Sequence, residues 1–171
     1  QQFNTLPDFD KLTPEFSRES EKGIMDLGLA RKKEGFGMVF EGGLEVKEAG
    51  EFTFRLGSDD GSRLFVNGKE LIDNDGTHGM EYKERSVELE PEMVKIRVDY
   101  FDWGGAQGLS LVVSGPGMDE VKLSSGAGKF EEDGWGKDDF NQMVMNQLPR
   151  WAQPVVGIAM ALAMAPLFNH L

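Results

Sequence analysis

The sequence contains no cysteine, and its 171 residues include only two histidines. The absence of cysteine excludes disulfide bonds, thiolate metal sites and a cysteine nucleophile. His78 and His170 lie in different segments, and neither accompanies a nucleophile motif, so no catalytic triad is recognisable. No Asn-x-Ser/Thr sequence occurs, and N-glycosylation is therefore not expected. We expect a protein without enzymatic activity.

Positive charge is scarce, and charge of either sign almost disappears towards the C-terminus. The chain has 18 Lys and Arg against 30 Asp and Glu, and Arg150 is the only one of these residues beyond Asp139. Residues 1–139 therefore carry a formal net charge of −13 (17 minus 30). So acidic a domain repels nucleic acids and anionic lipid surfaces and attracts cations. Nucleic acid is not an expected partner, and the acidity serves either cation binding or solubility.

Helical periodicity is nearly absent between residues 36 and 123, where short alternating segments follow one another. In one of them Phe52, Phe54 and Leu56 are predicted to face inward, and Thr53 and Arg55 outward. The clearest alternation covers residues 93–101, whereas residues 86–89 predict only a short strand. Turn signals recur every eight to twelve residues, a spacing typical of sandwiches and barrels. The region is therefore predicted to be all-β.

Two adjacent acids stand at the centre of this region, in the stretch from Gly57 to Gly68. We expect Gly61 to supply a positive φ after them, and Asn67-Gly68 to close a hairpin. Turn chemistry does not require Asp59 and Asp60 side by side, and two such carboxylates repel each other. A cation, or several N–H donors, would relieve that repulsion. A glycosidase function does not fit, because its two carboxyls must stand about 5 Å or more apart around a sugar.

Taken together, the motifs from about Phe36 to Val113 resemble those of the PA14 domain family. They occur in chain order as Phe40-Glu41-Gly42, Ala49 to Phe54, Ser58 to Lys69, Asp75 to His78, Val98 to Phe101, the Gly-rich loop Asp102 to Gly108, and Leu109-Ser110-Leu111. Residues 6–10 are similar to the lead-in that precedes such domains. The resemblance implies an antiparallel β-sandwich.

The resemblance also implies a binding site. In sugar-binding members of the family the acid pair is joined by a cis peptide and holds a Ca²⁺ ion that also binds glycan hydroxyls. Carried over, Asp59 and Asp60 would be the metal ligands. A second loop would complete the site with Asp102, Trp103, Gly104, Gly105 and Gln107. Calcium prefers six to eight oxygens, so backbone carbonyls and water would have to join the carboxylates.

Each part of that site has a simpler alternative. Asp59 and Asp60 could accept N–H bonds that hold the turn, and Trp103 could be a partly buried lid instead of a platform that stacks on a sugar. Asp73, Asp75 and His78 share one loop, but their spacing lacks the EF-hand pattern, and a polar hairpin loop is the preferred interpretation.

The C-terminal segment differs from the rest in composition. Residues 151–168 carry no charge and, as a helix, would span about 27 Å, close to the roughly 30 Å of a bilayer core. Gly157, Ala161 and Ala165 form a stripe of small residues that lets another helix approach. We predict a membrane-spanning helix, and the alternative is a buried helix that docks on the protein's own domain.

The predicted organisation has four parts. Residues 1–35 form an extended lead-in packed on the sandwich, residues 36–123 the PA14-like domain, residues 124–139 an acidic Gly/Ser-rich linker, and residues 140–171 the apolar helix. The chain begins with Gln1, which favours a processed N-terminus. A single-pass membrane protein is expected, with its N-terminal domain on the lumenal, periplasmic or extracellular side; a thylakoid would suit it, although no residue indicates one.

Two functions are consistent with this organisation. The preferred one is a non-catalytic accessory subunit or adaptor of a membrane complex, which contacts other subunits through its C-terminal helix. The alternative is a membrane-tethered, Ca²⁺-dependent carbohydrate-binding module, such as a lectin or adhesin, whose partner is a glycan.

Overall fold

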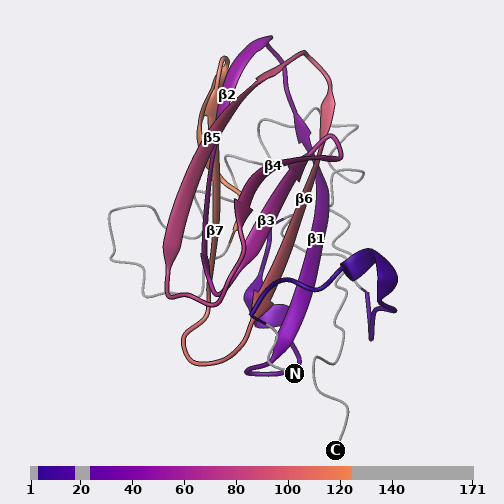
Figure 1. Ribbon diagram of the computed structural model, residues 1–171. Helices are drawn as coiled ribbons and strands as arrows, with labels where there is room; N and C mark the ends of the chain where they lie inside the picture. The colour runs from indigo at the N-terminus through magenta and orange to yellow at the C-terminus, as the bar shows by residue number, and fades with distance from the viewer. Residues whose placement is uncertain (1–3, 18–23, 125–171) are drawn as a thin grey trace, which may run out of the picture.

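The computed structural model describes residues 4–17 and 24–124, which fold as two antiparallel sheets packed face to face (Figure 1). The predicted all-β sandwich is confirmed. Within these ranges helix is limited to two short 3-10 turns, η1 (Phe9–Lys11) and η2 (Leu27–Leu29), and no helix could cross a membrane. The predicted linker and apolar helix, with Gly157, Ala161 and Ala165, lie outside the described residues.

The described residues form two sheets of four strands each. The first sheet has the order β1-β6-β3-β4 and the second the order β5-β2-β7-β8. The strands of the first sheet are β1 (Phe36–Glu45), β6 (Met93–Asp102), β3 (Ser62–Val66) and β4 (Lys69–Asn74). Those of the second are β5 (Glu81–Leu89), β2 (Gly50–Asp59), β7 (Gly108–Gly115) and β8 (Met118–Lys122).

The strands lie where the alternation predicts them, and the largest difference in length is that of β5. The short strand expected at residues 86–89 begins at Glu81, because β5 pairs with β2 from Gly50↔Leu89 to Ser58↔Glu81. Most of the β5 side chains are exposed, so the apolar pattern extends over only part of the strand. The start of β5 is set by backbone pairing, which the hydropathy pattern of the sequence does not show.

The main core lies between the sheets and is built from the inward positions of each strand. Phe52, Phe54 and Leu56 are completely buried, as predicted, while Thr53 and Arg55 lie on the outer face. Burying each such large side chain contributes about 1.5–3 kcal/mol.

At the β3–β4 turn, Asn67 and Gly68 both have positive φ (49° and 78°), as the predicted hairpin requires.

A second, smaller apolar cluster lies on the outer face of the first sheet, where the lead-in packs on it. Leu6 and Phe9 are buried there against Val39 and Phe101. The ring of Phe9 crosses Gly37 so closely that a Cβ on this glycine would lie 2.6 Å from it. These contacts hold residues 6–9 on the first sheet, and the segment turns through η1 instead of running fully extended.

Candidate metal centre

The two adjacent acids lie at one end of the sandwich, between β2 and β3. Asp59 is the last residue of β2, and its side chain is half-buried. Asp60 follows it and is almost completely buried. The peptide bond that joins them is cis, as the resemblance implies.

The Asp60 carboxylate holds two loops together. Its Oδ1 accepts a hydrogen bond from the backbone N–H of His78 (3.1 Å), and its Oδ2 accepts one from the backbone N–H of Trp103 (2.7 Å). These donors lie 18 and 43 residues away in the sequence. Asp60 therefore accepts N–H bonds, as the alternative interpretation proposed, yet each oxygen keeps a lone pair for a cation.

A third carboxylate, that of Asp102, lies at the same end of the molecule. Asp102 is the last residue of β6 and is completely buried, and neither of its oxygens has a hydrogen-bond partner among the described residues. Burial, the charge of Asp60, and then those of Glu34 and Asp59 raise its pKa to about 7; the N–H of Gly35 opposes this without forming a bond of normal geometry. A buried carboxylate without a partner is costly, and a bound cation would remove that cost.

Asp59 experiences the same accumulation of negative charge. Burial and the neighbouring Asp60 raise the pKa of its carboxyl, and His78 opposes them. Its backbone carbonyl accepts a hydrogen bond from the Tyr100 hydroxyl (2.6 Å), which fixes the end of β2 against β6. The acid pair is thus held in place by the core.

Both ring nitrogens of His78 contact backbone carbonyl oxygens. Its Nδ1 lies 2.8 Å from the carbonyl oxygen of Gly79, and its Nε2 lies 3.1 Å from that of Asn74. Both neighbours are acceptors, so only the protonated imidazole donates to both. Although burial opposes it, these two carbonyls and the charges of Glu81 and Asp60 raise the pKa of His78.

The carboxylates of Asp73 and Asp75, which share a loop with His78, bind other residues of the protein. Arg63 donates to Asp73 (3.4 Å) and to Asp75 (2.8 Å), and the Asp75 carboxylate also accepts the N–H of Leu6 (2.7 Å). Asp75 therefore joins the loop to the lead-in. The interpretation of a polar hairpin loop agrees with these contacts.

A buried polar network lies beneath the acid pair. The hydroxyls of Ser58 and Ser62 share a 2.6 Å hydrogen bond, and the Asn74 amide donates to Ser58 (3.0 Å) and to the carbonyl of Glu81 (3.1 Å). Within the described part of the chain, Asn74 Oδ1 is a further buried acceptor without a partner. The two serines of the Ser-Asp-Asp-Gly-Ser motif thus stabilise the turn through buried hydrogen bonds.

Gly61 is needed for space instead of for backbone freedom. Its φ is not positive, contrary to the expectation from the sequence. A Cβ at this position would lie 2.4 Å from the Phe101 ring and 2.8 Å and 2.9 Å from the backbone O and N of Gly76. The missing side chain lets the loop that carries His78 approach the acid pair.

Replacing Gly61 by Ala is therefore expected to destabilise the fold by about 2–4 kcal/mol, because the clash involves backbone atoms that cannot turn aside. Denaturant unfolding measures this loss. Gly79→Ala is the matched control, since no described atom lies within 4 Å of its added Cβ. Equal stability of the two variants would contradict the role given to Gly61.

The loop from Asp102 to Gln107 brings only part of its predicted residues to the acids. Trp103 packs against the lead-in cluster, which favours the lid interpretation over a sugar platform. The Gln107 side chain donates to the carbonyl oxygen of Lys33. Gly104 and Gly105 have positive φ (154° and 95°), and Gly105 is exposed. Asp102 alone adds a side chain to the acid pair.

The carboxylates do not complete a metal shell on their own. Among the described residues, no group of three or more His, Asp or Glu side chains is arranged to hold a metal ion. Calcium takes six to eight oxygens, many of them backbone carbonyls and waters. The unpartnered Asp102 oxygens beside two further acids fit such an ion, provided that the glycine-rich loop and water supply the remaining oxygens.

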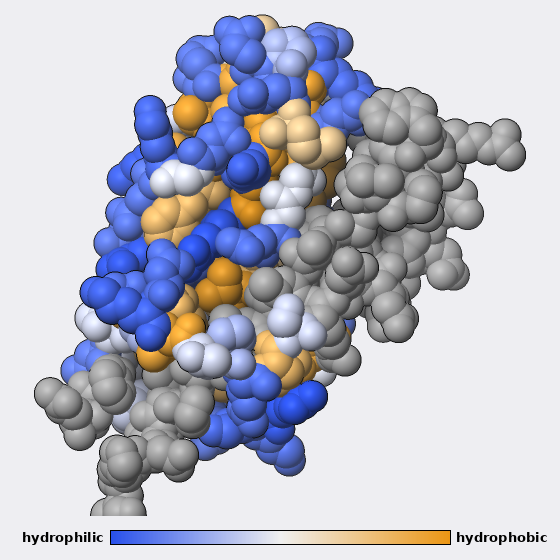
Figure 2. Space-filling model, turned by 90° about the vertical axis from the view of Figure 1, so that its right-hand side faces the viewer, coloured by the Kyte–Doolittle hydropathy of each residue, from blue (hydrophilic) through white to orange (hydrophobic). Residues whose placement is uncertain are grey.

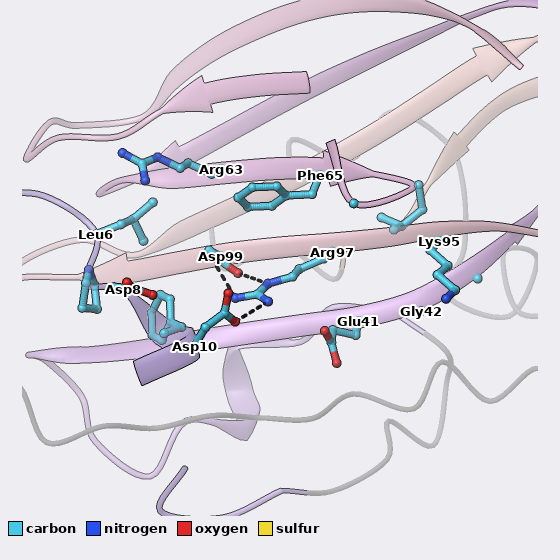
Figure 3. A pocket seen from close by; sticks show the side chains of 15 residues that line it. Leu6, Asp8, Asp10, Glu41, Gly42, Arg63, Phe65, Lys95, Arg97 and Asp99 are labelled. Atoms are coloured by element: carbon cyan, nitrogen blue, oxygen red, sulfur yellow. Dashed lines mark hydrogen bonds and ion pairs between the residues drawn. The ribbon is translucent and has the colours of Figure 1, made fainter. Parts of the chain in front are cut away.

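A separate hollow of about 960 Å³ lies between the lead-in and the outer face of the first sheet (Figure 3). Arg97 crosses it and donates to Asp99 (2.7 Å) and Asp10 (2.7 Å). Arg97 thus forms an ion pair with each of these two carboxylates. On the side of the molecule seen in Figure 2, hydrophobic side chains appear in several patches between hydrophilic ones. This hollow holds none of the residues predicted to bind a ligand.

Comparisons with known proteins agree with the fold. Solved structures similar to the chain include the PA14 domain of the MpAFP antifreeze protein (23% identity, TM-score 0.46, covering 52% of this chain and 48% of that one). A PA14 sugar-binding domain from an RTX adhesin is 27% identical, with a TM-score of 0.45, and the match covers 53% of this chain and 50% of that one. An anti-sigma factor domain-containing protein is 22% identical, with a TM-score of 0.51, and the match covers 67% of this chain and 40% of that one. The chain thus spans half or less of each of these structures.

A search of curated proteins finds no match. The sequence model of the PA14 domain, however, matches residues 23–126, more than half of the chain. The match includes the acid pair, the Asp102 loop and all eight strands. This chain belongs to the PA14 domain family.

Proposed function

We propose that the chain is a Ca²⁺-dependent carbohydrate-binding module whose cation is held by Asp59, Asp60 and Asp102. The observation that carries this proposal is the completely buried Asp102 carboxylate, whose two oxygens have no hydrogen-bond partner among the described residues. Every neighbouring charge that raises its pKa is negative. Without a cation, the Asp102 carboxylate would lie close to like charges with no hydrogen bond among the described residues to offset them.

The three acids have different tasks in this proposal. Asp59 and Asp102 offer carboxylate oxygens, while Asp60 also holds the two surrounding loops through His78 and Trp103. The backbone carbonyls of the glycine-rich loop after Asp102, together with water, would supply the remaining oxygens. When bound, Ca²⁺ supplies coordination positions for neutral sugar hydroxyls.

The charge of the domain indicates which ligands suit the site. Residues 1–139 carry a net charge of −13, and Asp59, Asp60 and Glu34 add negative charge around Asp102 at the site. Phosphates and other anions would meet this field unfavourably, whereas sugar hydroxyls carry no charge. Membership of a family with sugar-binding members supports the same ligand class.

Calcium titration of the metal-free chain by calorimetry tests the metal. We expect saturable heat from the wild type and none from the Asp59→Asn/Asp60→Asn variant. Asp119→Asn/Glu120→Gln is the control, because both acids are exposed on β8 and their replacement removes the same two negative charges. If the wild type gives no heat, or the double variant binds as the wild type does, the metal site is wrong.

A glycan array probed with and without Ca²⁺ tests the ligand. We expect neutral glycans to bind only in calcium, and silence in calcium would contradict the carbohydrate function while leaving the metal site intact. The accessory-subunit role, the membrane location and the absence of enzymatic activity stay predictions, since the first two rest on residues 140–171.

A further inference from the structure

Two exposed apolar side chains lie together on the outer face of the second sheet. Among the described residues the exposed large hydrophobic side chains are Met80 (43% exposed), Tyr82 (54%) and Met93 (50%). Met80 and Tyr82 are close in sequence and cover the same part of β2 and β7, whereas Met93 covers Gly43 of the other sheet. A clustered exposed pair calls for an explanation more than a single residue does.

The pair lies flat across two glycines. Tyr82 is the cross-strand partner of Gly57, and a Cβ on Gly57 would lie 2.4 Å from its ring and 3.0 Å from Met80 Cε. The Met80 sulfur would lie 2.8 Å from a Cβ on Gly108. Because neither glycine has a side chain, the Tyr82 ring and the Met80 thioether lie directly on the backbone, and their opposite sides face solvent.

This surface adjoins Asp59. Gly57 and Asp59 are two residues apart in β2, so they share the outer face at a spacing of about 7 Å. Gly108 pairs with Asp59 across the sheet, and a Cβ on Gly108 would lie 3.7 Å from that of Asp59. Met80 therefore bridges the space between the tyrosine ring and the acid pair.

We infer that Tyr82 and Met80 form a platform for the apolar face of a sugar ring whose hydroxyls reach the cation at Asp59. The inference rests on the proposed function and adds the two side chains that would contact the sugar ring. A hexose in its ring form has C–H groups on one face and hydroxyls at its edge. An exposed aromatic ring beside a cation matches both features, as polar groups beside an apolar wall commonly do in ligand sites.

The position of Tyr82 excludes a large contribution to the core, since more than half of the side chain is exposed. A purely structural alternative exists, because an aromatic ring over a cross-strand glycine stabilises a strand pair. That alternative predicts a change in stability with no change in sugar affinity. The two accounts therefore differ in a measurable quantity.

The test uses the full chain with a panel of neutral monosaccharides (glucose, galactose, mannose and N-acetylglucosamine) immobilised on an array in Ca²⁺. We expect Tyr82→Ser to lower the affinity for the bound sugar by about 10- to 100-fold and Tyr82→Phe to retain it within about threefold. Met80→Thr should weaken binding by several-fold and gives a second variant if Tyr82→Ser does not fold. Met93→Ser, which removes an equally exposed apolar side chain elsewhere, should bind as the wild type does.

Calcium calorimetry on the same variants separates this inference from the proposed function. Unchanged calcium affinity with weakened sugar binding supports the platform. Unchanged sugar binding in Tyr82→Ser overturns it alone, as does an equal loss of calcium affinity. Wild-type dimers that dissociate on Tyr82→Ser would also overturn it, by assigning the patch to contacts between copies. A wild type that binds no sugar overturns both the platform and the carbohydrate function.

Discussion

Replacing Asp102 by Asn is expected to abolish calcium binding while making the metal-free protein more stable. The Asp102 carboxylate is completely buried and, within the described residues, receives no hydrogen bond. Asn has nearly the same shape and no charge, so the unfolding free energy at pH 8 should rise by about 1–3 kcal/mol. Calcium affinity should fall by at least about 100-fold, because charged ligands dominate it. Denaturant unfolding and calorimetry measure the two effects.

The same substitution at Asp99 provides the matched control. Asp99 lies on the same strand and is also buried, but its carboxylate accepts hydrogen bonds from Arg97 at 2.7 Å and 3.3 Å. Asp99→Asn should therefore lower the unfolding free energy, by about 2–4 kcal/mol, and leave calcium affinity unchanged. If Asp102→Asn destabilised the metal-free fold as Asp99→Asn does, Asp102 would be a structural residue and the metal site would lose its main support.

The stability of the metal-free protein is expected to fall as the pH rises from about 4 to 8. The pKa of Asp102 is raised from 3.8 to about 7 in the folded state. A raised folded-state pKa stabilises the fold fully below the unfolded pKa, and that contribution is lost as the pH passes through 7. For this fully buried group the loss should be on the order of 2–4 kcal/mol. Chemical unfolding in calcium-free buffers across this range measures it.

Asp102→Asn again supplies the control, because the folded state also raises the pKa values of other groups, including His78 and Asp59. The difference in unfolding free energy between wild type and variant should grow with pH and level off above pH 8. Saturating calcium at pH 8 should stabilise the wild type alone. A difference that did not depend on pH would show that Asp102 has an ordinary pKa, and hence that it is not the unpartnered acid of the metal site.

Much of the fold could be predicted because its signals are local. The alternation of Phe52, Phe54 and Leu56 determines which face of β2 is buried, since successive side chains of a strand point to opposite faces. Asn67-Gly68 determines the β3–β4 turn, because both residues tolerate positive φ. The family motif likewise indicated the acid pair and the Asp102 loop, each of which is a run of neighbouring residues, and the resemblance placed the two runs in one site.

The rest depended on contacts between residues far apart in sequence, which periodicity does not record. The alternation of β5 could not show that this strand begins at Glu81, because its pairing with β2 sets that boundary. Gly61 was expected to have a positive φ, yet it serves the approach of Gly76 and Phe101. Trp103 and Gln107 were placed in the site by the motif, but they face the lead-in and Lys33.

By itself, then, the sequence determined the all-β class, the hairpin and the adjacency of Asp59 and Asp60, which are properties of neighbouring residues. Only the tertiary structure decided that Asp102 is left without a hydrogen-bond partner among the described residues, that His78 and Trp103 donate to Asp60, and that Tyr82 lies across Gly57. The physical reason is the same in each case. Burial and hydrogen bonding depend on residues that are far apart in the sequence and come together only in the folded chain. The charge of Asp102 is therefore unfavourable only in the folded state, where it is buried.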